Sequence, residues 1–149
     1  MKNQVNRYEI TLKKTLESVE SFGPLNSSDK AAAFARQFYH ENIELYESFF
    51  IVMCNNNLTP KAWAKISQGG TVGTIVDVKI VAKYASDSLA DYIFLVHNHP
   101  SGKLVPSADD KRLTETIAGA LRLFLSTRVA DHIILTTDDY FSFHDNGLI

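Results

Sequence analysis

The most informative stretch of the sequence is a strand-to-helix junction, Val96-His97-Asn98-His99-Pro100-Ser101-Gly102-Lys103-Leu104-Val105-Pro106-Ser107-Ala108-Asp109-Asp110. It begins at the C-terminal end of an apolar run, where α/β sheets tend to place their functional sites. Because side chains alternate between the two faces of a strand, His97 and His99 are predicted to point the same way. Pro106 and Ser107 then begin a predicted helix, whose first turn carries Asp110. The junction therefore predicts two imidazoles and one carboxylate close together.

Two histidines and a carboxylate form a ligand set for Zn²⁺, which leaves the fourth tetrahedral position for a water whose pKa falls to about 7. Each half of the pattern also has an ordinary explanation. A His-x-His sequence is common by chance, and Ser107-x-x-Asp110 is also a helix-capping pattern. Both patterns occur within 14 residues around one junction, which favours a metal site. Capping does not exclude function, because a Ser107 hydroxyl that accepts a backbone N–H keeps its own proton to donate.

The rest of the chain alternates between apolar runs and helical periodicities, which predicts an α/β layer fold. Residues 137–139 are few enough for a hairpin, so part of the sheet is expected to be antiparallel. An N-terminal arm is expected over residues 1–26 and one domain over residues 27–149. The predicted strands are 49–54, 63–67, 92–96, 132–136 and 140–144, and the alternation in 8–12 allows one more. The predicted helices are 27–44, 76–92 and 107–126.

Composition indicates a globular protein and excludes several other classes. The chain has 149 residues, of which 45% are hydrophobic and 21% are charged, the usual balance of a folded domain. Its 15 basic and 17 acidic residues give a net charge of -2, which argues against a protein whose main task is to coat DNA. The single cysteine, Cys54, excludes an internal disulfide and a four-thiolate zinc site, and its apolar neighbours predict a buried thiol. Neither a signal peptide nor a membrane span is evident, so we expect a cytoplasmic protein without membrane contact.

Several motifs together resemble a known family. His97-x-His99, seven residues, Ser107, two residues and Asp110 are similar to the JAMM motif of the JAB/MPN metalloprotease superfamily. The longer strings His-Asn-His-Pro-Ser-Gly and Pro-Ser-x-x-Asp resemble the bacterial RadC family in particular. The resemblance covers about residues 27–149. Further segments in the order of that family are Glu47 before an apolar strand, Gly70-Thr71 after a turn, Asp-His-Ile-Ile at 131–134, Tyr-Phe-Ser-Phe at 140–143 and Gly147-Leu148.

The resemblance implies both an architecture and a set of roles. The implied fold is a mixed β-sheet flanked by helices, related to the cytidine deaminase architecture, although the deaminase signature itself is absent. His97, His99 and Asp110 correspond to the ligands of one Zn²⁺ per chain. Ser107 corresponds to the residue that supports the tetrahedral oxyanion. Glu47 corresponds to the acid/base that takes a proton from the zinc-activated water and delivers it to the leaving amine.

Two of the candidate residues have a second interpretation. A surface glutamate is the ordinary interpretation of Glu41, Glu44 and Glu47 alike, and Glu47 is favoured because it borders a strand that can fix a general base. His132 lies at the start of a predicted strand. It is either a hydrogen-bonded structural histidine or a support for a metal ligand.

These observations predict a zinc-dependent hydrolase of amide bonds that acts on a peptide or protein-conjugate substrate. One alternative is a DNA-repair-associated accessory protein of the RadC type without robust peptidase activity, and another is a catalytically silent scaffold. We expect nucleic-acid binding to be weak, because the chain is slightly acidic and is too short for the helix-hairpin-helix region usual in RadC proteins. The sequence leaves a homodimer open.

Overall fold

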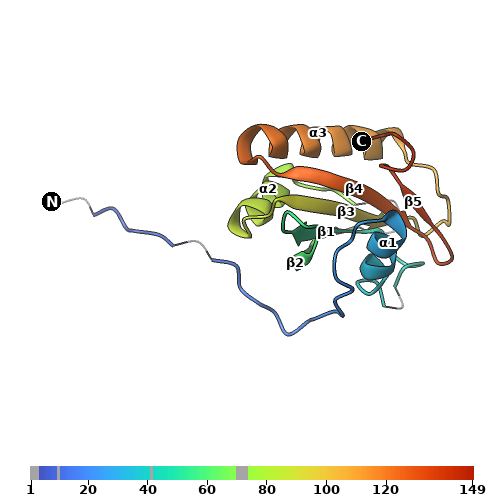
Figure 1. Ribbon diagram of the computed structural model, residues 1–149, viewed down its shortest axis with the longest axis horizontal. Coiled ribbons are helices and arrows are strands. Elements are labelled where there is room, and N and C mark those ends of the chain that lie inside the picture. The colour runs from blue at the N-terminus through green and yellow to red at the C-terminus, as the bar shows by residue number, and fades with distance from the viewer. Residues whose placement is uncertain (1–3, 10, 41, 70–73) are drawn as a thin grey trace.

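A five-stranded mixed sheet forms the centre of the fold in a computed structural model of the chain (Figure 1). The structure describes residues 4–9, 11–40, 42–69 and 74–149. The strand order is β2-β1-β3-β4-β5, in which β3 and β4 pair in parallel and the other neighbours pair antiparallel. The elements are α1 (Ser28–Arg36), β1 (Ser48–Cys54), β2 (Pro60–Gln68), α2 (Val78–Asp87), β3 (Tyr92–Asn98), α3 (Ala108–Leu125), β4 (Arg128–Leu135) and β5 (Tyr140–Ser142). This confirms the predicted α/β class with a mixed sheet flanked by helices, and the predicted hairpin joins β4 to β5.

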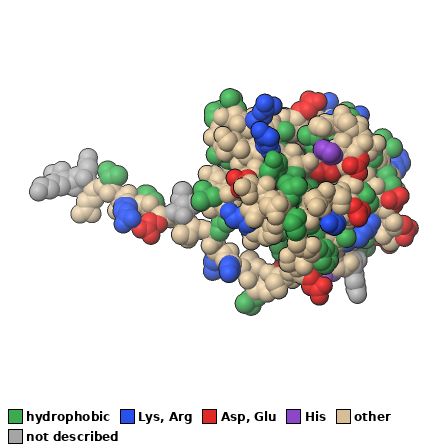
Figure 2. Space-filling model, in the orientation of Figure 1, with side chains coloured by type: hydrophobic (Ala, Val, Ile, Leu, Met, Phe, Trp, Pro, Cys, Tyr) green, Lys and Arg blue, Asp and Glu red, His purple; other side chains and the backbone are tan. Residues whose placement is uncertain are grey.

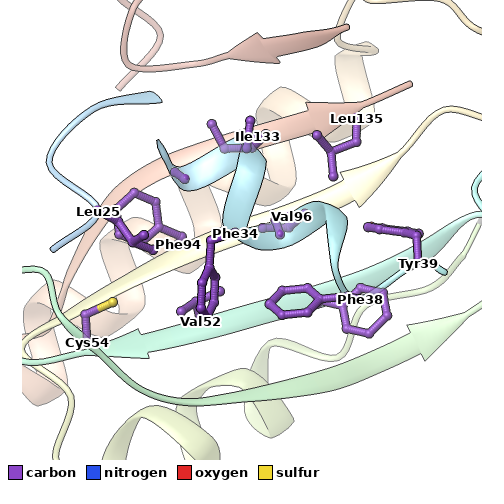
Figure 3. Packing of buried hydrophobic residues seen from close by; sticks show 14 residues of the cluster. Leu25, Phe34, Phe38, Tyr39, Val52, Cys54, Phe94, Val96, Ile133 and Leu135 are labelled. Atoms are coloured by element: carbon purple, nitrogen blue, oxygen red, sulfur yellow. The ribbon is translucent and has the colours of Figure 1, made fainter. Parts of the chain in front are cut away.

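Helices cover both faces of the sheet because its central strands are apolar on both sides, as is usual for strands buried on two faces. All residues of β1 are buried. Its even-numbered apolar residues pack with α1, and its odd-numbered residues pack with α2 and α3. Figure 3 shows the α1 side, where Phe34 and Phe38 lie over strand residues Val52 and Val96. Cys54 belongs to this core as predicted, and burial raises the pKa of its thiol to about 12.

The first helix is shorter than predicted, because it ends at Arg36 instead of continuing to residue 44. The apolar side chains that follow the helix pack against β1 and β2, and the backbone that carries them forms turns instead of helix. Phe38 stacks on Trp63 with ring centroids 4.4 Å apart, and the hydroxyl of Tyr39 donates a hydrogen bond to the carbonyl of Ser48 at 3.0 Å. His40 has a left-handed backbone with φ of 48°, which does not continue a helix. The chain therefore turns toward the sheet before β1 begins.

Other element bounds differ from the prediction for local reasons. The second helix occupies less than the predicted 76–92, because the Asp77 side chain caps it by accepting from the backbone N–H of Lys79. It ends before Leu89, whose φ is 51°. The fourth strand begins earlier than the predicted residue 132, because Arg128 already pairs with Tyr92. In the described part of the chain, no helix is both long and apolar enough to cross a membrane.

The N-terminal arm does not form the strand that the alternation in 8–12 allowed. Tyr8 and Leu12 are exposed and outside any strand, and Ile10 lies outside the described residues. Figure 1 shows the described residues of this part of the chain extending away from the sheet, and none of these described residues pairs with a strand. The end of the arm does contact the domain. Leu25 is buried and its backbone N–H donates to the carbonyl of Leu58 at 2.9 Å.

Candidate metal centre

The C-terminal end of β3 places two histidines on the same face of the sheet, as predicted. His97 is buried near the end of the strand, and His99 follows the strand and is partly exposed. Their Nε2 atoms lie 3.0 Å apart. The backbone N–H of His99 donates to the carbonyl of Leu135 at 2.9 Å, which continues the pairing with β4 beyond the end of β3. The strand pairing therefore fixes the backbone of both histidines.

The loop after β3 fixes the ring of His99. Gly102 adopts a left-handed backbone with φ of 80°, a conformation that glycine adopts without strain, and its N–H donates to the carbonyl of His99 at 3.0 Å. This turn brings the carbonyl oxygen of Lys103 to 2.7 Å from His99 Nδ1. Because a carbonyl only accepts, Nδ1 carries the proton of that bond. Nε2 of His99 is therefore the ring nitrogen that faces the site.

The first turn of α3 brings the carboxylate of Asp110 to the same place. Ser107 is the N-cap, and its hydroxyl accepts from the backbone N–H of Asp110 at 3.0 Å. The backbone N–H of Ser107 donates to Asp110 Oδ2 at 2.7 Å, so the predicted capping box is present. The same carboxylate faces both histidines, with Oδ1 3.3 Å from His97 Nε2 and Oδ2 3.4 Å from His99 Nε2. Capping therefore orients Asp110 toward the site.

The electrostatics of these three groups favour a positive charge between them. Burial acts to raise the pKa of Asp110, but hydrogen bonds to His97 and His99 outweigh it and hold the pKa far below its ordinary value. The contact with Asp110 in turn raises the pKa of His99, against the opposing effect of burial. The carboxylate is therefore anionic, and a cation lying between the three side chains is stabilised.

The spacing of the three side chains fits a tetrahedral metal ion. Zn²⁺ binds histidine nitrogen and carboxylate oxygen at about 2.0–2.2 Å, so two ligands of a tetrahedron lie about 3.3–3.6 Å apart. The separations of 3.0, 3.3 and 3.4 Å between ligand atoms of His97, His99 and Asp110 are close to this range. The three residues form a group that can hold a metal ion. Their assignment as zinc ligands stays a prediction.

Glu47 lies next to this group at the start of β1. Its side chain is half-buried, and burial raises the pKa of its carboxyl, while the charges of His97 and His99 act in the opposite direction. The neighbouring Glu44 is exposed, and its carboxylate accepts from the hydroxyl of Thr137 at 2.7 Å. The charges of the site therefore act on the Glu47 carboxyl, whereas the Glu44 carboxylate is hydrogen-bonded to Thr137. Glu41 and the Gly70-Thr71 pair of the family resemblance lie outside the described residues.

Asn98 holds the segment of Glu47 against the strand of the histidines, a role that the sequence analysis missed. Its side chain is fully buried and points to the face opposite His97 and His99. Oδ1 accepts from the backbone N–H of Ser48 at 2.8 Å. Nδ2 donates to the carbonyls of Ile43 and Tyr46, each at 2.7 Å. The residues on either side of Glu47 are therefore tied to one side chain. The sequence signal that could have indicated such a role is a polar residue between the two histidines at the end of an apolar strand.

His132 of β4 contacts a candidate ligand directly. Its Nε2 lies 2.7 Å from His97 Nδ1, and its Nδ1 lies 2.6 Å from the hydroxyl of Thr114 on α3. The ring is fully buried and stacks on Phe143, with centroids 4.6 Å apart. Burial, and then the charge of His97, lower the pKa of His132 well below its ordinary value, so the ring is neutral. The structure confirms the interpretation of His132 as a buried, hydrogen-bonded histidine, and its contact with His97 is the geometry that the second interpretation, support of a metal ligand, requires. That second interpretation stays a prediction.

The sheet order, the helices on both faces and the cluster of two histidines and one aspartate define the class of protein: an α/β domain with a candidate metal centre at the end of a central strand. Residues 25–148 match the family model of the RadC-like JAB domain, and the chain belongs to this family. The match confirms the family resemblance, and it includes every candidate site residue.

Relatives of the chain carry names that state no activity. The UPF0758 protein of Flavobacterium johnsoniae is 41% identical over 103 residues, which are 69% of this chain and 44% of the relative. The UPF0758 protein of Porphyromonas gingivalis is 38% identical over 104 residues, 69% of this chain and 45% of the relative. The UPF0758 protein YeeS of Escherichia coli is 36% identical over 103 residues, 69% of each chain. The match thus spans less than half the length of the first two relatives, so the activity of a whole protein of this kind is a matter for proposal.

Proposed function

We propose that this domain is a zinc-dependent hydrolase of amide bonds, with a peptide or a protein conjugate as its substrate. The observation that carries the proposal is the convergence of His97 Nε2, His99 Nε2 and the Asp110 carboxylate, with the separate carboxylate of Glu47 in electrostatic contact. Membership of the JAB family supports it. Three ligands with a fourth position left for water are typical of catalytic zinc sites.

His97, His99 and Asp110 would hold the zinc ion through the atoms that already face one another. When bound, zinc supplies Lewis-acid chemistry, in that it polarises a carbonyl and acidifies water near neutral pH. The side chains of the domain supply the proton transfer, the stabilisation of developing charge and the orientation of the site.

Glu47 acts as the acid/base in this proposal. It takes a proton from the attacking water and gives it to the leaving amine. Burial supports this role because it raises the pKa of the Glu47 carboxyl toward the range in which a carboxylate accepts and then returns a proton. The hydrogen bonds of Asn98 to Ser48 and Tyr46 keep Glu47 at a fixed distance from the histidines.

Ser107 supports the oxyanion. Its hydroxyl oxygen accepts the backbone N–H of Asp110, which leaves the hydroxyl proton to donate. Ser107 is exposed, so a substrate reaches it from solvent. The capping bond holds the hydroxyl within the same turn of helix as the candidate ligand Asp110.

The test compares Glu47→Gln with Glu44→Gln, since both make the same chemical change in one short segment. Zinc content is measured first, and turnover is then measured on a panel of peptides and ubiquitin-like conjugates. We expect Glu47→Gln to keep zinc at the wild-type level and to lose about 10²–10⁴-fold in hydrolysis, the usual contribution of general acid–base catalysis. Glu44→Gln should retain wild-type turnover. Loss of zinc in Glu47→Gln, or undiminished turnover, contradicts the assignment.

We also propose that the protein binds nucleic acid only weakly and that it is cytoplasmic. Whether it forms a homodimer stays open. Figure 2 supports weak nucleic-acid binding, because basic and acidic side chains are interspersed on the visible face instead of forming one basic surface. Binding of nucleic acid without regard to sequence depends on such a surface.

A further inference from the structure

A buried chain of hydrogen bonds joins both sides of the candidate metal centre behind its ligands. It runs from His97 Nδ1 to His132 Nε2 at 2.7 Å, and from His132 Nδ1 to Thr114 Oγ1 at 2.6 Å. Thr114 Oγ1 then lies 2.6 Å from the backbone carbonyl oxygen of Asp110, one helical turn earlier. The chain therefore starts at one candidate ligand and ends at the residue that carries another.

The carbonyl at the end of this chain determines which atom donates each of its hydrogen bonds. The carbonyl of Asp110 can only accept, so the single hydroxyl proton of Thr114 is donated to it. Toward His132, Thr114 then acts as acceptor, so His132 carries its proton on Nδ1. A neutral imidazole with its proton on Nδ1 has a lone pair on Nε2. His132 Nε2 therefore accepts, and the proton between the two histidines belongs to Nδ1 of His97.

We propose that His132 is a positioning residue of the metal centre, which accepts the Nδ1 proton of His97 so that His97 presents Nε2 to the metal. Thr114 determines that His132 carries its proton on Nδ1 and therefore accepts a hydrogen bond at Nε2. The inference rests on the proposed metal site. The reverse arrangement would place a proton on His97 Nε2, the atom that faces His99 and Asp110, and would prevent coordination there.

The two histidines achieve the same orientation by different means. His99 donates its Nδ1 proton to a carbonyl of the adjacent loop, at Lys103. His97 lies within the sheet, where backbone carbonyls are used by strand pairing, and a side chain of the neighbouring strand provides the acceptor instead. Partners of this kind fix the tautomer of a metal-bound histidine, and their loss costs about 10–100-fold in metal affinity.

The decisive comparison replaces His132 by glutamine, asparagine and leucine. A glutamine carbonyl oxygen reaches the place of Nε2 and restores an acceptor for His97, whereas asparagine reaches only the place of Nδ1, and leucine offers neither. Zinc affinity is measured by competition with a chelator, and the stability of the metal-free protein is measured by urea denaturation. We expect the asparagine and leucine variants to bind zinc about 10–100-fold more weakly than wild type, and His132→Gln to recover most of this loss.

A second pair of variants and a spectroscopic measurement keep the test independent of the folding of the His132 variants. Thr114→Val removes the hydroxyl at nearly constant size and should weaken zinc binding. Thr114→Ser keeps the hydroxyl and should bind zinc about as tightly as wild type. Nitrogen-15 NMR of the imidazole rings in zinc-loaded wild type should show His97 and His132 both protonated on Nδ1. In Thr114→Val the preference of His132 for this tautomer should be lost.

The possible results separate the inference from the proposed function. Wild-type zinc affinity in His132→Asn and His132→Leu, or a glutamine variant no better than asparagine, would overturn the positioning role, as would a Nε2 proton on His97 in the zinc-loaded protein. A loss of stability without a change in zinc affinity would show that His132 is purely structural. Absence of zinc binding by wild type would overturn both the metal centre and the inference. Zinc binding without hydrolysis would overturn the proposed function and leave the inference standing.

Discussion

Replacement of Asn98 by alanine tests whether one buried side chain holds the candidate general base near the candidate ligands. The substitution removes three hydrogen bonds, to the backbone N–H of Ser48 and to the carbonyls of Ile43 and Tyr46. A hydrogen bond of this kind contributes about 0.5–1.5 kcal/mol, and a buried partner left unsatisfied costs more. We therefore expect the free energy of unfolding to fall by about 3 kcal/mol, which for a chain of this size lowers Tm by about 6–12 °C.

Urea denaturation of metal-free protein measures this loss, with Asn42→Ala as the control. Asn42 is exposed and lies in the same segment, so its replacement should change stability by less than about 0.5 kcal/mol. Asn98→Asp keeps the acceptor for Ser48 but places an oxygen against two carbonyls, and it should destabilise at least as much as alanine. If Asn98→Ala unfolds at the same urea concentration as the Asn42→Ala control, the three bonds do not hold this segment and the reasoning fails.

Three further predictions concern the site and its partners. His99→Ala should lose stoichiometric zinc, measured by metal analysis after dialysis, yet keep its fold by circular dichroism, because His99 is partly exposed and lies beyond the end of β3; retention of zinc would remove His99 from the ligand set. Ser107→Ala should keep zinc but lose about 2.7–4 kcal/mol of transition-state stabilisation, measured as a lower kcat/KM. Because it also removes a helix cap, the free energy of unfolding should fall by about 0.5–2 kcal/mol. An unchanged kcat/KM would show that Ser107 acts only as a cap. Fluorescence anisotropy with duplex DNA should show only weak binding that disappears with salt, since a chain of net charge -2 can neutralise few phosphates; tight, sequence-selective binding at physiological salt would favour the accessory-protein alternative.

The strand-to-helix junction was predictable because its signals are local. Alternation along a strand places His97 and His99 together, and a capping pattern at a helix start places Asp110 near Ser107. Each rule depends on residues a few positions apart. The structure confirms both the shared face of the histidines and the capping box.

The missed features depend on contacts between distant parts of the chain. From the sequence, Thr114 is an ordinary helix residue, and only the folded chain places His132 of β4 against it. Asn98 is likewise an ordinary strand residue in the sequence, and only the turns after α1 bring Ile43 and Tyr46 to its side chain. The predicted helix through residue 44 failed for the same reason, since the packing of Phe38 on Trp63 outweighs the helical periodicity of the segment.

The topology explains why these parts meet. Helix α3 is the crossover between the parallel neighbours β3 and β4, so its first turn begins at the C-terminal end of β3, where His97 and His99 lie. From there α3 runs back along the sheet and packs over the neighbouring strand, β4. Thr114, one turn after Asp110, therefore lies over His132 of β4. A single crossover thus supplies both the candidate ligand Asp110 and the hydroxyl that orients the support of His97, and a shift of α3 along the sheet would disturb both contacts together.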